Sequence, residues 1–314
     1  MFGLLGLLGL IAALIGLGAR FLPLSSQPVM IVAAAAPYLA AAAPVAALLL
    51  LLRLRLLLFL VALAVTAAAV TVYLPRYQAP SPSAQQAVGV RVLTTNLGMG
   101  QANATDFATL ARESADIVAV QEMTQDAATG LSKAGMDAAF PYRVIVPAPL
   151  ASGIGIWSRY PIVDSGRIDG YALPMIGTRI RIPGVAIDTT VLSIHLAAPW
   201  PQPIDHWRAD LHRLPDTLAE VGRSAGAGAV IVAGDFNSTA DMAPFRALLT
   251  GGYSDAVAGA GLARTYPASG MWFPLLGIDH VLVKNAAAAS VRTVSVPGGD
   301  HRGLLTDLRI QPPA

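Results

Sequence analysis

The sequence predicts an α/β protein in which two packed mixed β-sheets are flanked by helices, a four-layer α/β/β/α sandwich, preceded by three transmembrane helices. Three observations predict this class. The chain has 314 residues and is 54% hydrophobic but only 13% charged, whereas an ordinary globular domain is about one quarter charged. Residues 1–80 contain no Asp, Glu, Lys or His. From Val88 onward, short runs rich in Val and Ile alternate with helical stretches.

Three apolar runs near the N-terminus are long enough to be membrane spans, which need about 20 apolar residues, with a range of about 17–25. They cover approximately Phe2–Gly18, Val29–Leu52 and Leu56–Leu74. Pro37 and Pro44 lie in the second run, where neighbouring helices can satisfy the interrupted backbone. No basic segment or small-residue cleavage site accompanies the first run, so a removed signal peptide is not expected. We expect a membrane arm over residues 1–75.

Four arginines indicate how the arm is oriented. Arg53 and Arg55 lie in the shortest loop, which the positive-inside rule places in the cytoplasm. The third span then runs outward, giving a multi-pass plasma-membrane protein with an extracytoplasmic polar domain. Arg20 and Arg76 lie on the wrong side in this arrangement. The sequence does not show whether the spans are only an anchor or also bind substrate.

The charge balance and the absence of cysteine exclude several kinds of site. The chain has 21 Lys+Arg and 19 Asp+Glu, net +2. Removing the four arginines before residue 80 leaves 17 against 19, net −2. The polar part therefore has no overall cationic excess, which weakens a nucleic-acid-binding interpretation without excluding it. Without cysteine there is no disulfide, thiolate zinc site or cysteine nucleophile.

A polar, Pro- and Ser-rich linker over residues 76–87 leads to a domain over residues 88–314. Nine runs in that domain read as strands: VGVRVLTTN, DIVAVQE, YRVIVP, GIGIWSR, TRIRI, AIDTTVLSIHL, AVIVAGDFN, DHVLVK and SVRTVSV. Helices are expected at about residues 104–114, 124–135, 204–224 and 242–250. Asp205 is the expected N-cap of the third helix. About 225 residues are enough to bury such a core.

Polar residues recur where these strands begin or end, which is where sites are normally assembled on a rigid scaffold. They are Asn96, Gln121, Glu122, His195, Asp235, Asn237, Asp279, His280, Asp300 and His301. Any one of them alone is more simply read as a turn residue or a structural histidine. Their recurrence at six places favours a single polar site.

The motifs TTN, QE, GIGIWSRYP, SIHL, GDFN, IDHVL and GDHRGL resemble, in this order, those of the endonuclease/exonuclease/phosphatase superfamily. The resemblance covers about residues 88–310. Three apolar spans followed by such a domain also resemble the VanJ-type teicoplanin-resistance membrane proteins. The sequence departs from the family pattern at Ile154, at Gly299 and at Gly303-Leu304. None of these departures removes a chemically active side chain.

The resemblance implies a phosphoester or phosphoanhydride hydrolase that uses Mg²⁺ or Mn²⁺. Glu122 is implied as the principal metal ligand, since Mg²⁺ prefers oxygen ligands, with Asn96 close by and Asp300 contributing. Asp279 would fix the tautomer of His301. Either His301 or Asp235 would be the general base, and the sequence does not decide between them.

The remaining side chains are expected to bind phosphate or to be structural. His195 and Asn237 would donate hydrogen bonds to non-bridging phosphate oxygens. Arg179, Arg208 and Arg302 are candidate phosphate clamps, although each could equally be a solvated surface arginine. His280 should point to the opposite side of its strand from Asp279, so we expect it to be structural.

Three apolar loops next to these motifs bear on the substrate: AAPWPQP, MWFPLLG and YALPMIG. Trp200, Trp272 and Phe273 are residue types that settle at a bilayer interface. Nuclease loops would carry Lys and Arg instead, yet the chain has only two lysines, Lys133 and Lys284.

We therefore expect as partners a lipid bilayer and a lipid-linked phosphate, for example polyprenyl diphosphate; no protein partner is implied. A sphingomyelinase- or phospholipase C-type phosphodiesterase, a membrane-tethered nuclease and a non-enzymatic binding module remain alternatives. The apolar loop MWFPLLG could also simply pack over the edge of the core.

Overall fold

The computed structural model describes residues 1–77, 87–259, 261, 263–269 and 273–310, which form two compact units. The first unit, called here the helical arm, comprises Met1–Gln78 together with Thr239–Ala247. The second, called the sandwich unit, comprises Ala79–Ser238 and Leu248–Ala314. Most of the expected linker, and the last four residues of the expected domain, lie outside the described residues.

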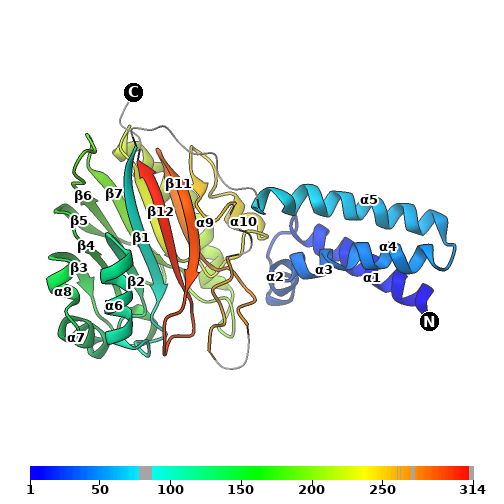
Figure 1. Ribbon diagram of the computed structural model, residues 1–314, viewed down its shortest axis with the longest axis horizontal. Helices are drawn as coiled ribbons and strands as arrows, with labels where there is room; N and C mark the ends of the chain where they lie inside the picture. The colour runs from blue at the N-terminus through cyan, green and yellow to red at the C-terminus, as the bar shows by residue number, and fades with distance from the viewer. Residues whose placement is uncertain (78–86, 260, 262, 270–272, 311–314) are drawn as a thin grey trace. The chain divides into compact units, whose positions relative to one another are not determined.

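The N-terminal part of the helical arm consists of apolar helices (Figure 1). They are α1 (Phe2–Ala19), α2 (Gln27–Ala34), α3 (Ala36–Ala40), α4 (Ala42–Leu51), α5 (Leu56–Tyr73) and the 3₁₀ turn η1 (Leu74–Tyr77). Two helices, Phe2–Ala19 and Leu56–Tyr77, are long and apolar enough to cross a membrane. The expected second span is instead a pair, Gln27–Ala34 and Ala36–Leu51, bent by 57°. Pro37 lies in the first turn of α3, where its missing N–H cannot continue the preceding helix.

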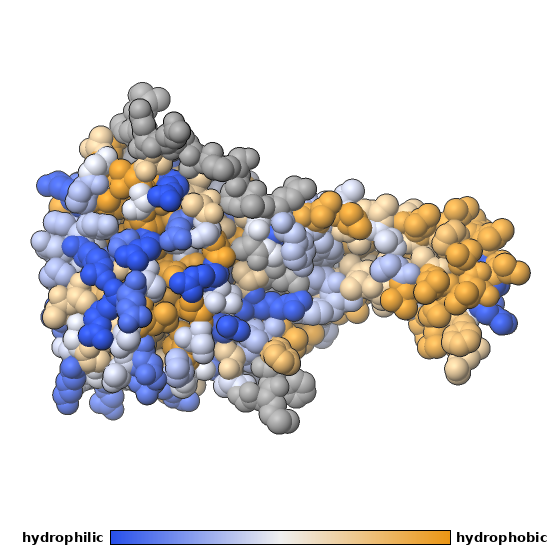
Figure 2. All heavy atoms as spheres, in the orientation of Figure 1, coloured by the Kyte–Doolittle hydropathy of each residue, from blue (hydrophilic) through white to orange (hydrophobic). Residues whose placement is uncertain are grey.

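Small residues allow the helices of the arm to pack closely. A Cβ on Gly6 would lie 2.9 Å from Leu50 Cγ, and one on Gly16 would lie 2.6 Å from Leu39 Cβ. Ala13, Ala43 and Ala46 are fully or almost fully buried between the same helices. Packing of this kind stabilises helix association where no hydrophobic driving force exists. The outward-facing residues are mostly apolar, as the orange surface of this part in Figure 2 shows.

Asp241, in segment 239–247, connects this segment to the C-terminal end of α1 and to η1, which follows α5. Its carboxylate is 2% exposed and pairs with Arg20, which follows α1, and with Arg76 in η1, at 3.0 Å. The Tyr73 hydroxyl donates to Asp241 Oδ1 at 3.1 Å. Arg246, in the short helix α10 (Ala243–Arg246), donates to the backbone carbonyl of Arg20. Arg20 and Arg76, the two arginines that do not fit the positive-inside pattern, therefore share one buried anion.

The sandwich unit contains two six-stranded mixed sheets (Figure 1). The first has the order β11 (Ala286–Val294), β12 (Gly303–Ile310), β1 (Val88–Asn96), β2 (Ile117–Gln121), β4 (Ile154–Ser158) and β3 (Tyr142–Val146). The second has the order β5 (Ile162–Ile168), β6 (Met175–Ile180), β7 (Thr189–His195), β8 (Val230–Asp235), β10 (Asp279–Lys284) and β9 (Ser254–Asp255).

Each sheet has one parallel pair at its centre, and these pairs position the polar residues. In β1–β2, Asn96 is the partner of Gln121. In β7–β8, His195 is the partner of Asp235, and antiparallel β10 starts beside them with Asp279 opposite Asp235. Because parallel strands end at the same edge of a sheet, the motif residues of each sheet are adjacent.

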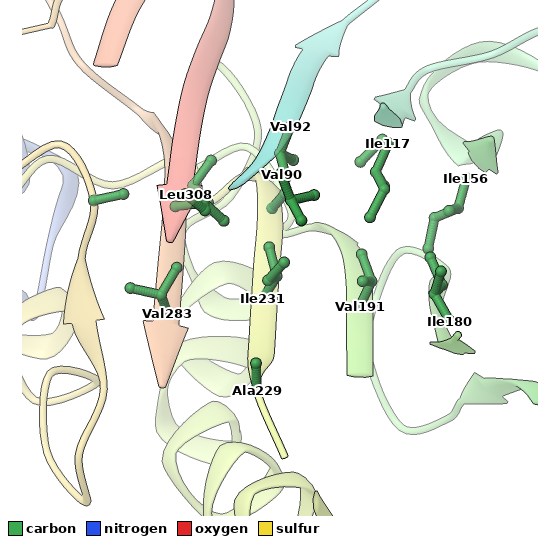
Figure 3. Close-up of a cluster of buried hydrophobic side chains, with 14 of the residues drawn as sticks. Val90, Val92, Ile117, Ile156, Ile180, Val191, Ala229, Ile231, Val283 and Leu308 are labelled. Carbon is green, nitrogen blue, oxygen red and sulfur yellow. The ribbon is translucent and has the colours of Figure 1, made fainter. Parts of the chain in front are cut away.

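The main core lies between the two sheets (Figure 3). In β2, Ile117 and Ala119 face this core, whereas Val118 and Val120 face the helices on the other side of the sheet. This alternation follows from the two-residue period of a strand. Both faces of the sheet are covered, so residues 117–120 of β2 are all apolar, and only its last residue, Gln121, is polar.

Helices cover the outer faces of both sheets. On the first sheet lie α6 (Ala104–Ser114), α7 (Gln125–Lys133) and α8 (Met136–Ala139). On the second lies α9 (Asp205–Ala225), which buries Trp207 against it. The predicted four-layer sandwich is confirmed.

Several predicted element boundaries were wrong. Strands β5, β9 and β12 were not predicted; β5 is mostly exposed and contains Asp164 and Arg167, so it lacks the apolar pattern of a strand. The helix expected at 242–250 is only Ala243–Arg246. Asp205 is the first residue of α9 rather than its N-cap, which is Ile204.

Replacing Asp241 by Asn should lower the melting temperature of the detergent-solubilised full-length protein. The change leaves the guanidinium groups of Arg20 and Arg76 without their carboxylate, and removing one partner of a buried ion pair costs about 3–5 kcal/mol. Asp205→Asn, at a side chain that is 81% exposed, is the matched control and should change the melting temperature little. Equal melting temperatures for the two variants would show that the buried pairing does not stabilise the arm.

Candidate active site

The Asp235 carboxylate lies at the centre of the polar group formed by the strand ends. It is the last residue of β8 and is 1% exposed. Its Oδ2 atom accepts a hydrogen bond from Asn96 Nδ2 at 3.1 Å and lies 3.7 Å from His195 Nε2 and 3.8 Å from His301 Nε2. One carboxylate oxygen thus contacts residues from β1, from β7 and from the loop before β12.

Glu122 lies at the first-sheet side of this group and is held by two donors. Its Oε1 accepts from Asn96 Nδ2 at 2.9 Å and lies 3.7 Å from His195 Nε2. Its Oε2 accepts from the backbone N–H of Met99 at 2.7 Å. Glu122 has a φ of 56°, a conformation that costs a residue with a Cβ about 1–2 kcal/mol. Such strain is characteristic of functional positions.

A left-handed turn over Gly98, Met99 and Gly100 supplies the N–H that holds Glu122. All three residues have positive φ, at 58°, 52° and 78°. The N–H of Gly98 donates to Asn96 Oδ1 at 2.9 Å, which orients the Asn96 amide toward Glu122 and Asp235. A Cβ on Gly98 would lie 2.8 Å from Asp300 Oδ1. Glycine is therefore required at position 98 by both conformation and space.

Asp279 and His301 form a buried pair on the second-sheet side. His301 Nδ1 lies 2.8 Å from Asp279 Oδ2, and both side chains are at least 95% buried. Burial by itself would lower the pKa of His301, but the carboxylates of Asp279 and Asp235 outweigh it and raise the pKa to about 10. The pKa of Asp235 is raised by its burial and by the negative charge of Asp279.

His195 and Asn237 complete the group, and each is fixed by a backbone carbonyl. His195 Nδ1 lies 3.2 Å from the Ala151 carbonyl, so Nδ1 carries a proton. Asn237 has a φ of 48°, and its N–H donates to Asp235 Oδ1 at 2.8 Å. Its Nδ2 donates one hydrogen to the Leu196 carbonyl at 2.9 Å.

The structure does not bring Arg179 or Arg208 to this group. Arg179 pairs with Asp188, which precedes β7 at the end opposite His195. Arg208 lies on the exposed side of α9, 3.7 Å from Asp205. Both arginines have nearby acids that sequence order does not reveal, so the expectation that they clamp phosphate is not supported.

Arg302 is half-buried and directly follows His301. Its Nε atom is buried and has no hydrogen-bond partner among the residues that the structure describes. Of the three candidate clamps, Arg302 alone is placed beside the polar group.

The contacts of His280 agree with the structural role expected for it, whereas the position of Tyr266 was not expected from the motifs. His280 lies 2.8 Å from Asp255 Oδ2 and 2.9 Å from the Ser238 carbonyl through its other nitrogen. Its position is structural, facing away from Asp279. Tyr266 was not expected in the site, yet its ring lies 4.8 Å from that of His301. The tripeptide TYP before the apolar loop was the only sequence signal for it.

Among the aromatic residues of the apolar loops, Trp200 and Phe273 are 61% and 86% exposed. Trp272 lies outside the described residues. The two described side chains therefore do not pack over the edge of the core.

A comparison with protein-family models matches residues 93–302 to the Endonuclease/Exonuclease/phosphatase family. The match covers about two thirds of the chain. The chain belongs to this family. No match was found among curated proteins.

Solved structures of the Endonuclease/Exonuclease/phosphatase family share this fold at low sequence identity. A humanized D. rerio TDP2 has a TM-score of 0.57 at 14% identity, covering 70% of this chain and 98% of its own. D. rerio TDP2 complexed with a single-strand DNA product has a TM-score of 0.57 at 15% identity and covers 70% and 98%. A family member from Bacteroides vulgatus has a TM-score of 0.56 at 16% identity and covers 71% and 100%.

Members of this family are typically hydrolases that act on phosphoester bonds and usually use a divalent metal. The donor set here suits such an ion. One ligand atom each from Asp235, Asp279 and His301 lie within 4.8 Å of one another. Within the described part of the chain, the buried oxygens Asp279 Oδ1 and Asp300 Oδ1 have no hydrogen-bond partner. Buried carboxylate oxygens without partners are costly unless a cation compensates them, and oxygen ligands are what Mg²⁺ and Mn²⁺ prefer.

Gly98→Ala should reduce metal-dependent phosphodiesterase activity by about tenfold or more, because the added Cβ displaces Asp300 and the turn that holds Glu122. The activity is measured with a soluble chromogenic phosphodiester.

Gly251→Ala is the matched control for Gly98→Ala. Gly251 has a φ of 61°, nearly that of Gly98, but an added Cβ there has nothing within 4 Å. An alanine at either position must keep a positive φ, which residues with a Cβ disfavour. Gly251→Ala should lower thermal stability and retain activity at 25 °C. Equal activity loss in both variants would mean that strain, rather than the Asp300 contact, is responsible.

The metal-free protein should become less stable as the pH rises from about 6.5 toward about 10. Since the pKa of His301 is raised to about 10 in the folded protein from 6.5, protonated His301 contributes stability below pH 6.5. That contribution is lost as the pH rises through the folded pKa. Melting temperatures of the metal-free wild type and of His301→Gln, measured between pH 6 and 10, test this. The variant should show the smaller decrease, and an equal decrease would exclude His301 as its cause.

Proposed function

We propose that this protein is a membrane-bound, divalent-metal-dependent phosphohydrolase. Its substrate is a lipid-linked phosphate, such as polyprenyl diphosphate, at the outer face of the plasma membrane. The observation that supports hydrolysis best is the convergence of Asn96, His195 and His301 on one buried Asp235 oxygen, with Glu122 held beside them. A group of carboxylates, amides and imidazoles of this kind suits attack of water on phosphorus.

In the proposed mechanism, Glu122 would be the principal ligand of Mg²⁺ or Mn²⁺, with Asp300 contributing and with Asn96 holding the Glu122 carboxylate in place. The ion, when bound, supplies positive charge that neutralises phosphate oxygens. Glu122 suits this role because its carboxylate is oriented by Asn96 and Met99 and remains partly exposed, at 15% of its side chain.

Asp235 is the favoured general base, and His301 the favoured cation. The raised pKa of Asp235 brings it closer to neutral pH, where a base is most effective. Asp235 accepts the proton of the attacking water, and the P–O bond to the leaving group breaks. The raised pKa of His301 keeps it protonated, so that it stabilises the developing charge while Asp279 holds its Nδ1–H.

His195 and Asn237 are proposed to bind the non-bridging oxygens. His195 Nδ1 faces the Ala151 carbonyl, so the proposed contact with phosphate is through Nε2. Asn237 has a second amide hydrogen besides the one given to Leu196. Arg302, next to His301, is the proposed additional cation.

Two features support a lipid-linked substrate. The same chain carries two helices long and apolar enough to cross a membrane, which resembles the VanJ-type arrangement. Trp200 and Phe273, in loops next to His195 and Asp279, are largely exposed although apolar or amphipathic. The positive-inside pattern of Arg53 and Arg55 favours an extracytoplasmic location for the sandwich unit.

The test compares polyprenyl diphosphate, sphingomyelin and plasmid DNA as substrates of the full-length protein in nanodiscs with Mg²⁺ or Mn²⁺. We expect phosphate release from polyprenyl diphosphate, lowered about 10²–10³-fold by Glu122→Gln. Asp126→Asn, an acid in the first turn of α7, is the control and should keep wild-type activity.

Each other outcome identifies an alternative. Release of the sphingomyelin headgroup would indicate a phospholipase C-type enzyme, and plasmid degradation a nuclease. No turnover of any substrate, with no stabilisation by either metal, would indicate a non-enzymatic module.

A further inference from the structure

Three exposed apolar side chains lie beside the catalytic group on three separate loops. Met99 is 48% exposed, Leu150 is 69% exposed and Leu275 is 47% exposed. Met99 and Leu150 were not singled out from the sequence, whereas Leu275 belongs to the apolar loop MWFPLLG. Exposed apolar residues are ordinary when scattered singly, so their relation to the site decides whether they matter. We call these three residues the apolar rim.

Met99 and Leu150 are each at most one residue away from a backbone group that contacts the site, and Leu275 is connected to the site through Tyr266. The N–H of Met99 donates to Glu122 Oε2 at 2.7 Å. The carbonyl of Ala151, which follows Leu150, lies 3.2 Å from His195 Nδ1. The N–H of Leu275 donates to the carbonyl of Tyr266 at 2.9 Å, and the Tyr266 ring packs on His301. The rim therefore borders the group at Glu122, at His195 and at His301.

Two of the three also have a backbone conformation that their side chains disfavour. Met99 has a φ of 52° and Leu150 a φ of 56°. The left-handed region is readily adopted by Gly, Asn and Asp but seldom by Met or Leu. Folding gains little from an exposed apolar side chain, so neither the residue type nor its conformation is explained by stability. A constraint of this kind at a site points to function.

We infer that the apolar rim binds the hydrocarbon chain of the substrate, next to the phosphate held by the catalytic group. The inference rests on the proposed function, which it deepens. Met and Leu are flexible and non-aromatic, so they suit an alkyl chain, whereas single-stranded nucleic acid is bound by aromatic stacking. The candidate membrane spans of the same chain keep the protein where such chains occur.

The test measures how binding depends on chain length, without requiring turnover. Full-length protein in nanodiscs is titrated with ethyl phosphate and with n-dodecyl phosphate below its micelle concentration. Affinities are obtained from ligand-dependent thermal stabilisation. Titration of empty nanodiscs corrects for partitioning of the dodecyl chain into lipid. Any residual partitioning is the same for every variant, so it cancels when variants are compared.

The critical variant is the double substitution Met99→Asn with Leu150→Asn. Asn suits the left-handed conformation, so the ligand-free variant should be at least as stable as the wild type. Its preference for dodecyl over ethyl phosphate should fall about tenfold, equivalent to about 1.4 kcal/mol. Ile187→Asn is the matched control, because Ile187 is 37% exposed and precedes β7 at the end opposite His195. It should keep the full preference.

An unchanged chain-length preference in the double variant, or an equal loss in the control, would overturn the inference. The inference and the proposed function fail separately. Absence of lipid phosphate hydrolysis by wild type would refute the proposed function, even if dodecyl phosphate still bound through the rim. Hydrolysis with a rim-independent preference would refute only the inference.

Discussion

The sandwich unit is organised around one buried negative charge, the carboxylate of Asp235. An ionised carboxylate away from water costs several kcal/mol unless other groups compensate it. Here the compensation comes from the Asn96 amide, the Asn237 N–H and the imidazoles of His195 and His301. Because each partner comes from a different strand or loop, the carboxylate is satisfied only when both sheets are assembled. The same requirement that stabilises Asp235 thus fixes the geometry of the reacting groups.

The sheets are built so that this convergence is possible. Each contains one parallel pair, β1–β2 and β7–β8, and each pair ends in the polar residues of a motif. Antiparallel neighbours then bring a third strand to the same edge, as β10 does with Asp279. Glu122, which directly follows β2, and Asn237, two residues after β8, both have a positive φ, a strain that is characteristic of functional positions.

Much of this arrangement could be predicted from the sequence. Continuous runs of Val and Ile predict the core strands, and the polar residues at the ends of these strands predict the site. What could not be predicted depends on partners distant in sequence. Arg179 resembles a phosphate ligand until Asp188 is seen beside it. Strand β5 lacks an apolar pattern because it is largely exposed. The role of Gly98 and Met99 depends on φ angles, and that of Tyr266 on a ring contact with His301.

Segment 239–247 is inserted in the sequence of the sandwich unit but belongs to the helical arm. It begins two residues after Asn237, yet its Asp241 is neutralised by arginines at the ends of apolar helices. A protein cut at the linker would retain this segment but lose Arg20, Tyr73 and Arg76. Met242 and Phe245, both buried in the intact chain, belong to the same short stretch. Expression of residues 79–314 alone would therefore leave the Asp241 carboxylate without the arginines that neutralise it, in a segment that also carries two buried apolar side chains.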